Sequence, residues 1–362
     1  MVDMNLVIPS IEQMAPYEAG KPLATLEREL GVSNAIKLAS NENPLGPSPR
    51  ALQAMLKAMH DSHRYPDAAA WALRERLSER LGMPMNEIIH GNGSSEVLEL
   101  ALRTFVGQGQ HVIFAEPSFV MYRMICMAAG VAFTAVPLRD LTHDLEAMTA
   151  AITPKTRMIF IANPNNPTGT YVARAALEQL LRNVDPEVVV VVDEAYTEYA
   201  EAPDFPNALS LRGLRERLIV TRTFSKIYGL AAQRIGYAVG PAPMIDYMNR
   251  VRPPFNVGTL GQVAALAALD DEEHVRASQE LNQDERTRLQ NALTSLGLAC
   301  APSQANFVYV DCKRPARPIY ESLLRKGVIV RPVPAATALR ITVGLPAENY
   351  RLLAALSEVL NA

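Results

Sequence analysis

Short, uniformly apolar runs alternate with longer segments of helical character through the middle of the chain. Runs this short and this apolar are typical of strands that are buried on both faces of a parallel sheet. The segments between them, such as 94–105 and 173–184, are long enough for crossover helices. The alternation predicts a layered α/β domain over about residues 46–255. The apolar runs are 111–115, 158–162, 188–193, 218–221 and 235–240.

Both ends of the chain have a different character. The first 45 residues hold four prolines and predict a loop-rich arm that packs on the small domain and the functional site. Residues 261–296 predict one or two long helices with a bend at the charged stretch 270–273. Further strand and helix candidates follow at 307–310, 328–330, 339–343 and 347–360. We therefore expect an arm over 1–45, a large domain over 46–260 and a small α+β domain over 261–362.

Composition narrows the class of protein. With 49% apolar and 20% charged residues, the 362-residue chain has the balance of a folded globular protein. Its net charge of −3 argues against a nucleic-acid binder, and no run reaches the ~20 apolar residues of a membrane span. The N-terminus lacks a secretory signal, and three widely spaced cysteines indicate reduced thiols, so we expect a cytoplasmic protein. The histidines show no metal-ligand spacing, so no metal is expected.

The strongest local signal is a lysine just past a strand end. Lys226 follows the apolar run 218–221, and open α/β sheets place their ligands at such ends. Ser225 is its neighbour, and Arg234 lies eight residues further on. A hydroxyl and a guanidinium can grip a phosphate around an amine nucleophile. A solvated loop with ordinary surface charges would have the same residues.

Two other segments follow strand candidates. The turn 163–169 (NPNNPTG) is stiff, and its Asn166 can hold a phenolate or hydroxyl, although it can also merely join a strand to a helix. Asp193 ends a run of five valines. A buried carboxylate there needs a cationic partner such as a protonated pyridine nitrogen, and Tyr196 can reach a hydroxyl on that ring. The alternative for Asp193 is the N-cap of a following helix.

A fourth segment, 91–96 (GNGSSE), opens an apparent helix. Its backbone N–H groups and the hydroxyls of Ser94 and Ser95 can bind phosphate. The same letters also fit an ordinary capping box, in which serine and glutamate side chains satisfy the helix start. Both interpretations of this segment are open at the sequence level.

Taken together and in this order, the four segments resemble the fold-type-I aminotransferases that use pyridoxal 5′-phosphate (PLP). Each motif is weak alone, but four in sequence order are specific. The resemblance continues in 40–46 (SNENPLG), 64–67 (RYPD) and 339–344 (LRITVG), which are similar to the histidinol-phosphate aminotransferase branch. It implies an α/β fold with a large, mainly parallel sheet flanked by helices, a small α+β C-terminal domain and an N-terminal arm.

The resemblance implies a role for each matching residue. The catalytic residues are Lys226, Asp193 and Tyr196, of which Lys226 carries PLP on its amine and moves the substrate's Cα proton. Asp193 pairs with the ring nitrogen, and Asn166 and Tyr196 hold the ring oxygen. Phe119 stacks on the ring face. The groups that grip the cofactor phosphate are Ser94, Ser95, Thr223, Ser225 and Arg234, together with Tyr65 reaching across a homodimer interface. The substrate side is lined by Tyr17, Asn41, Arg331 and Arg340, with Arg340 on the substrate's anionic group.

The implied reaction transfers the amino group of histidinol phosphate to 2-oxoglutarate, as in histidine biosynthesis, with small molecules as the only partners besides a second copy of the chain. Three alternatives stay open: an aromatic amino-acid aminotransferase, a threonine-phosphate decarboxylase and a non-catalytic PLP-binding module. The chain departs from the branch at three places. Ser95 stands where an acidic residue is frequent, Phe119 where tyrosine is frequent, and Ala232-Gln233 where Gly-Leu is usual.

Overall fold

The computed structural model describes residues 7–16, 20–333 and 336–361. Its centre is a seven-stranded sheet with the order β2-β8-β7-β6-β5-β3-β4. The strands are β2 (Ile88–Gly91), β3 (His111–Glu116), β4 (Ala132–Pro137), β5 (Thr156–Ala162), β6 (Val189–Asp193), β7 (Leu218–Thr223) and β8 (Gly236–Val239). The pairs from β4 through β7 are parallel, which confirms the predicted α/β fold with a mainly parallel sheet.

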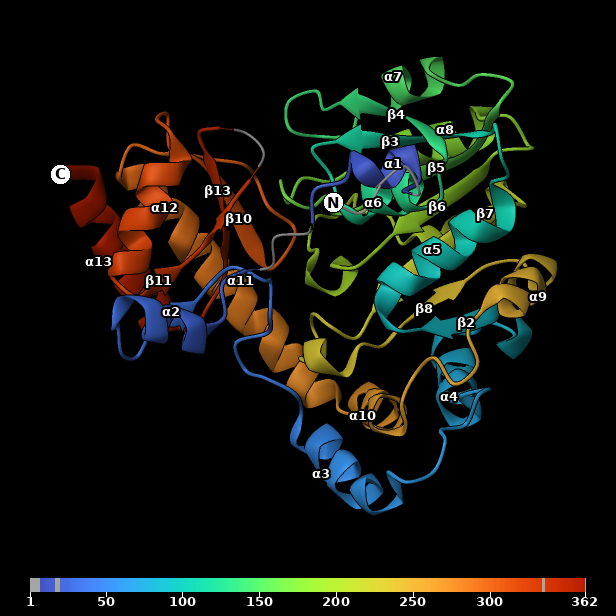
Figure 1. The fold of residues 1–362 in the computed structure, drawn as a ribbon, viewed down its shortest axis with the longest axis horizontal. Coiled ribbons are helices and arrows are strands. Elements are labelled where there is room, and N and C mark those ends of the chain that lie inside the picture. Colours follow the sequence, from blue (N-terminus) through green and yellow to red (C-terminus); the bar gives the residue numbers. More distant parts are fainter. Residues whose placement is uncertain (1–6, 17–19, 334–335, 362) are drawn as a thin grey trace.

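Helices cover both faces of this sheet (Figure 1). One face packs on α5 (Gly93–Phe105), α6 (Met121–Ala128) and α9 (Ala242–Val251). The helices that pack on the other face are α3 (Pro49–Ala58), α4 (Trp71–Leu81), α7 (Leu145–Ala150), α8 (Arg174–Asn183) and α10 (Thr259–Leu269). The valines of β6 explain why the strand is apolar throughout: Val190 and Val192 face one cluster, and Val189 and Val191 face the other.

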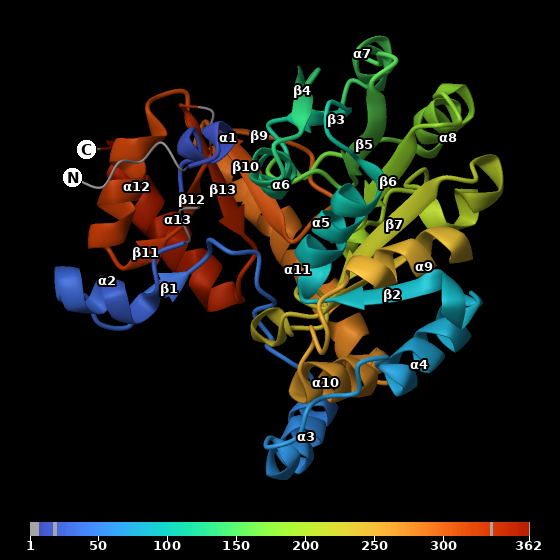
Figure 2. The same ribbon diagram turned by 45° about the vertical axis from the view of Figure 1, so that its right-hand side comes forward.

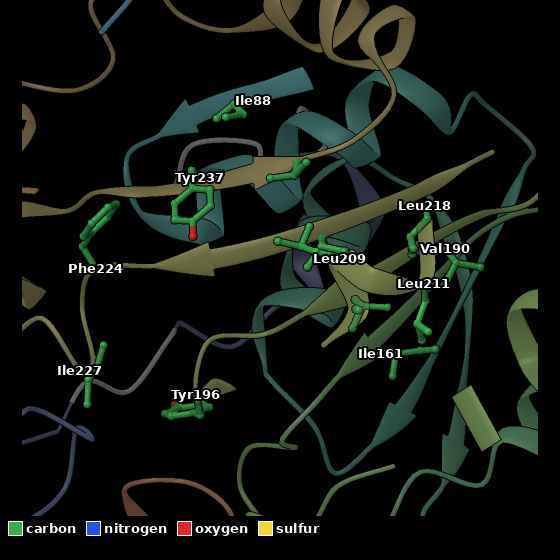
Figure 3. Close-up of a cluster of buried hydrophobic side chains, with 14 of the residues drawn as sticks. Ile88, Ile161, Val190, Tyr196, Leu209, Leu211, Leu218, Phe224, Ile227 and Tyr237 are labelled. Carbon is green, nitrogen blue, oxygen red and sulfur yellow. The ribbon is translucent and has the colours of Figure 1, made fainter. Parts of the chain in front are cut away.

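Figure 3 shows the first of these clusters, in which Val190, Leu218 and Ile161 come from neighbouring strands. Phe224 and Tyr196 lie past the strand ends in the same view. The apolar interior therefore continues up to the edge of the sheet where the candidate site is built. Removing this much apolar surface from water on both faces is the main term that holds the sheet in place.

The predicted strand 235–240 differs from the expectation, because β8 runs antiparallel to both β7 and β2. The connection from β7 to β8 contains only the 3₁₀ turn Ala231–Gln233, and a parallel return would need a crossover of a dozen or more residues with a helix. The edge strand β4 and the short strand β2 were not predicted. β4 is mostly half-exposed, and β2 has four residues, so neither gives a long apolar run.

The C-terminal elements lie beside the large sheet. The long helix α11 (Glu272–Ser295) runs between these elements and the large sheet (Figures 1 and 2). A four-stranded antiparallel sheet has the order β12-β13-β10-β9. Its strands are β9 (Ala299–Cys300), β10 (Phe307–Asp311), β12 (Arg331–Pro332) and β13 (Ala338–Thr342). The helices α12 (Ala316–Arg325) and α13 (Pro346–Asn361) share an apolar cluster with this sheet.

The N-terminal segment is more regular than the predicted loop-rich arm. It contains α1 (Pro9–Glu12), α2 (Leu23–Leu30) and β1 (Ile36–Lys37). β1 pairs in parallel with β11 (Val328–Ile329), and Leu26 of α2 is fully buried in a cluster with Ile329. α1 lies against α6 of the large sheet. Domain boundaries at residues 45 and 260 stay predictions.

Of the helices in the described part of the chain, none combines the length and the apolarity that crossing a bilayer requires.

Candidate active site

The candidate site lies where several strands end at one edge of the large sheet. β5, β6 and β7 are neighbours, with Ala162 beside Asp193 and Asp193 beside Thr221. β2 points the same way as β7 because both are antiparallel to β8. Ligands bind outside such carboxyl ends in open α/β sheets, and a cavity of about 250 Å³ is present here. The predicted residues that line it are Asn41, Ser94, Ser95, Phe119, Asn166, Asp193, Tyr196, Thr223, Ser225, Lys226, Arg234, Arg331 and Arg340.

Lys226 lies in the loop after β7, where its amine has lost most of its contact with water. Burial, with a smaller contribution from the positive charge of Arg340, lowers the pKa of Lys226 to about 7, and the negative charge of Glu42 opposes both. Its Nζ donates to the carbonyl oxygen of Ser40 at 3.2 Å. A large share of the amine is therefore neutral at physiological pH, and only the neutral form is a nucleophile.

Asp193 ends β6 and is 3% exposed. Its Oδ1 accepts from the hydroxyl of Thr221 at 2.9 Å, and its Oδ2 accepts from the hydroxyl of Tyr122 at 3.0 Å. These contacts exclude the N-cap alternative, because both oxygens bind side chains instead of helix-start N–H groups. Burial raises the pKa of Asp193 to about 6, while the two hydroxyl donors hold it down. A buried carboxylate of this kind favours a cationic partner in the cavity.

The start of α5 has the geometry of an anion site. The side chain of the N-cap residue, Asn92, makes no capping hydrogen bond, while Glu96 accepts the N–H of Asn92 at 2.6 Å. Of the two hydrogen bonds of a capping box, only the one from the N-cap N–H to the glutamate is therefore present. The Arg234 guanidinium lies against this helix start: a Cβ added at Gly93 would be 2.5 Å from its Nη2.

Hydroxyl groups complete this anion site. Nη1 of Arg234 donates to Oγ of Ser225 at 3.3 Å, and the N–H of Ser225 donates to Oγ1 of Thr223 at 3.1 Å. Ser94 belongs to the first turn of α5 and is buried. Helix-start N–H groups, hydroxyls and a guanidinium around one space are the donors that a phosphate dianion requires.

The opposite wall of the cavity comes from the small sheet and the N-terminal segment. Arg340 of β13 donates from Nη1 to Oδ1 of Asn166 at 2.6 Å and from Nη2 to the carbonyl oxygen of Ala39 at 2.6 Å. Nδ2 of Asn41 donates to the phenol oxygen of Tyr196 at 2.9 Å. Each group expected at the ring oxygen is thus hydrogen-bonded to a group expected at the substrate. The amide N–H groups of Asn166 are the donors that a ring oxygen would require.

Two predicted residues are not placed in this cavity. Tyr65 is 82% exposed and stacks on Phe255, with ring centroids 4.6 Å apart. Tyr17 lies outside the described residues. No group of three or more histidine, cysteine, aspartate or glutamate side chains within the described ranges is arranged to hold a metal ion.

A sequence model of the family "Aminotransferase class I and II" matches residues 33–356. The chain belongs to this family. The aminotransferase is 46% identical over 362 residues to Histidinol-phosphate aminotransferase 2 of Pseudomonas fluorescens, covering 99% of this chain and 98% of that protein. A histidinol-phosphate aminotransferase of Moorella thermoacetica is 46% identical over 355 residues, covering 97% of this chain and 92% of the relative.

The fold of the aminotransferase is similar to that of a solved relative. The crystal structure of histidinol-phosphate aminotransferase from Sinorhizobium meliloti in complex with pyridoxal 5′-phosphate superposes with a TM-score of 0.91 at 29% identity, covering 99% of both chains. Together with the family match, this likeness confirms the resemblance that the sequence motifs indicated.

Sequence reasoning missed two side chains that contact this site in the aminotransferase. Tyr122 follows Phe119 by three residues at the start of α6, where the two rings meet edge-on, and Thr221 is the cross-strand neighbour of Asp193. The first signal was present in the sequence, although the apolar neighbours of Tyr122 obscure it. The second needs the pairing of β6 with β7, which the sequence does not state.

Proposed function

We propose that this chain is a PLP-dependent aminotransferase that converts histidinol phosphate and 2-oxoglutarate to imidazole acetol phosphate and glutamate, a step of histidine biosynthesis. The family match and the histidinol-phosphate aminotransferases at 46% identity support the reaction. The observation that carries the proposal is the cavity itself. It joins a buried amine with a pKa of about 7, a buried carboxylate, and a helix start beside the Arg234 guanidinium and the Ser225 hydroxyl.

The residues of the cavity fit PLP. Asp193 would meet the ring nitrogen, Asn166 and Tyr196 the ring oxygen, and Phe119 a face of the ring. The helix start that its N-cap side chain leaves uncapped would take the phosphate, and the absence of a side chain at Gly93 lets the Arg234 guanidinium approach that helix start. The side chains that we assign to the phosphate are Ser94, Ser95, Thr223, Ser225 and Arg234. When bound, PLP supplies an aldehyde for the amine and a ring that takes up the electron pair from the substrate's Cα.

The chain's own groups position the substrate and move its proton. We assign the transfer of the Cα proton to Nζ of Lys226, because it is a buried amine with a pKa near neutrality. The ionised carboxylate of Asp193 would hold a proton on the ring nitrogen. Tyr196 and Asn166 would keep the ring oxygen in place, and Asn41 and Ala39 line the same cavity.

Two arginines give the cavity its preference for anions. Histidinol phosphate has no α-carboxylate, whereas glutamate does, so one group must bind phosphate in one half-reaction and carboxylate in the other. The planar guanidinium of Arg340 suits both anions. Arg331 also lines the cavity and would supply the second positive charge that a phosphate dianion needs.

The functional unit that we infer is a cytoplasmic homodimer in which Tyr65 reaches the PLP phosphate of the partner subunit. Exposure of a tyrosine stacked on a half-exposed phenylalanine supports an interface at this place.

The aromatic amino-acid alternative keeps one observation in its favour. A recess next to the cavity, which shares Phe119, Asn166 and Arg340 with it, is lined by Met14, Met124 and Met127. Methionine side chains adapt to apolar groups of different shape, so an aromatic side chain would fit there.

A single half-reaction separates these readings. PLP-loaded protein is mixed with histidinol phosphate or with phenylalanine, without an acceptor, and the conversion of bound PLP to pyridoxamine phosphate is followed by absorbance. We expect histidinol phosphate to react faster at matched low concentration. In Arg331→Ala, its rate should fall about tenfold, more than the rate with phenylalanine, because a charge-assisted contact is lost.

Other outcomes identify the alternatives. Faster reaction with phenylalanine would make the chain an aromatic amino-acid aminotransferase. Release of carbon dioxide from threonine phosphate, with no requirement for an oxoacid, would make it a decarboxylase. If no amine converts the cofactor, the proposed transaminase activity is refuted.

A further inference from the structure

Tyr122 is a fully buried tyrosine in the second layer beneath the candidate site. It belongs to α6, has no exposed surface, and donates its hydroxyl to Oδ2 of Asp193 at 3.0 Å. Thr221 of β7 donates to the other oxygen, Oδ1, at 2.9 Å. Two donors from two different elements therefore fix the plane of the carboxylate, whereas one donor alone would leave it free to rotate.

The ring of Tyr122 is itself held on three sides. It stacks on Phe160 of β5 with centroids 4.8 Å apart and planes 3° apart. It meets Phe114 of β3 at 6.1 Å and Phe119 edge-on at 5.8 Å and 88°. Such packing leaves the hydroxyl a single position, and a buried hydroxyl needs the partner that it has there.

We propose, on the basis of the proposed function, that Tyr122 is a positioning residue that orients Asp193 toward the cofactor ring nitrogen and supports Phe119 against the ring face. One side chain thus sets the geometry of two contacts on the same ring. Tyr122 reaches neither the cofactor nor the substrate in this assignment, because it acts through Asp193 and Phe119.

The donated hydrogen bonds also favour the ionised form of the carboxylate. Burial raises the pKa of Asp193 to about 6, and the hydroxyls of Thr221 and Tyr122 oppose that rise. Two charged groups also act on Asp193: Glu194, its chain neighbour, raises its pKa, and Lys226, from the loop after β7, lowers it. Glu194 is itself paired with Arg222, so the two hydroxyl donors are the contacts of Asp193 that a single substitution removes most simply.

The test uses Tyr122→Phe, which keeps the ring and removes only the donor. Tyr237→Phe is the matched control, because Tyr237 is also buried and its hydroxyl hydrogen-bonds to Arg222, a residue of the Glu194 pair and not a donor to Asp193. Both variants are first compared by thermal melting. Thr221→Val removes the other donor and serves as a second variant should Tyr122→Phe fail to fold.

Two readouts report on Asp193 without any turnover. The carboxyl band of Asp193 in infrared difference spectra of the apoprotein, assigned with Asp193→Asn, gives its pKa. The nitrogen-15 chemical shift of labelled PLP in the loaded protein gives the protonation of the ring nitrogen. In Tyr122→Phe we expect the pKa of Asp193 to rise, the ring nitrogen to lose proton population, and the dissociation constant of PLP to increase about tenfold. Tyr237→Phe should change none of these quantities by a comparable amount.

A double-mutant cycle distinguishes positioning from general structural damage. In the Asp193→Asn background, Tyr122→Phe should cause little further loss of PLP affinity, because the group through which it acts is already changed. A full additional loss in that background, or an unchanged pKa and nitrogen-15 shift in Tyr122→Phe alone, would overturn the proposal. The infrared readout needs no amine substrate, so failure of histidinol phosphate to react would leave this test intact.

Discussion

At the scale of single residues, the positive charge near Lys226 leads to a signed prediction. Burial and the charge of Arg340 lower the pKa of Lys226 to about 7. Below that pH the amine is protonated and unreactive, and above it the amine is free to attack an electrophile. Arg340→Gln removes one of the charges, so the pKa of Lys226 should rise and its reactivity should begin at higher pH.

The measurement is made on the apoprotein. Acetic anhydride labels Lys226 across a pH series, and mass spectrometry of its peptide gives the midpoint. Arg317→Gln, in an exposed helical pair with Glu321 on α12, is the control and should leave the midpoint unchanged. An identical midpoint in the protein with and without Arg340 would contradict the electrostatic account.

The residues of the candidate site were predictable to the extent that strand ends bring them together. Asp193 and Lys226 each follow an apolar run, and parallel neighbours place such ends at one edge. Tyr122 was not predicted because its role depends on α6 packing against β6, a contact between segments far apart in the chain. The hydrogen bond from Asn41 to Tyr196 depends on the N-terminal segment crossing to the large sheet, which no local pattern specifies.

At the scale of elements, the start of α5 carries the second prediction. Gly93 has φ +76°, and a Cβ there would lie 2.5 Å from Nη2 of Arg234. Gly93→Ala should therefore displace the guanidinium from the helix start and raise the dissociation constant of PLP at least about tenfold, since a charge-assisted phosphate contact is disturbed. Fluorescence titration of the apoprotein with PLP measures the change.

Gly109 offers a control with the same backbone strain and none of the crowding. Its φ is also +76°, and no atom lies within 4 Å of a Cβ added there. Both alanine variants should lose about 1 kcal/mol of stability from the left-handed conformation. Only Gly93→Ala should lose PLP affinity. Equal losses of affinity in the two variants would show that backbone strain is responsible, and not the displacement of Arg234.

Strands marked by continuous apolar runs were predicted well, and those set by tertiary pairing were not. β5, β6 and β7 contain the predicted runs because strands buried on both faces have apolar residues at consecutive positions. The direction of β8 follows from a connection too short for a crossover, and β1 exists only because it pairs with β11, nearly three hundred residues later. Two-residue strands of this kind have no pattern of their own.

At the scale of the whole molecule, a group of large apolar side chains is exposed on α3, α4 and the neighbouring loops. Leu56, Met59 and Trp71 are each more than half exposed, and Tyr65, which lies between Met59 and Trp71 in the sequence, stacks on Phe255. Exposed apolar surface of this extent indicates an interface between protein chains. It supports the proposed homodimer, in which we expect Tyr65 to reach the partner's site.

The last prediction is that Tyr65→Phe weakens PLP binding several-fold, since a phenol donor to the phosphate is lost, without lowering the melting temperature of the apoprotein. Sedimentation should show a dimer for both proteins. An unchanged PLP dissociation constant would remove Tyr65 from the site.

Hybrid dimers decide whether Tyr65 acts in its own subunit or in the partner's. One hybrid joins a Tyr65→Phe subunit to a Lys226→Ala subunit. Its only intact Lys226 therefore lies in the subunit that lacks the Tyr65 phenol. If Tyr65 acts across the interface, this site receives the phenol of the partner subunit and binds PLP with normal affinity. The reciprocal hybrid joins an unaltered subunit to one that carries both substitutions. The site with the intact Lys226 then has only the substituted position 65 of the partner subunit available to it. Action across the interface therefore predicts normal affinity in the first hybrid and weakened affinity in the second, whereas action within one subunit predicts the reverse.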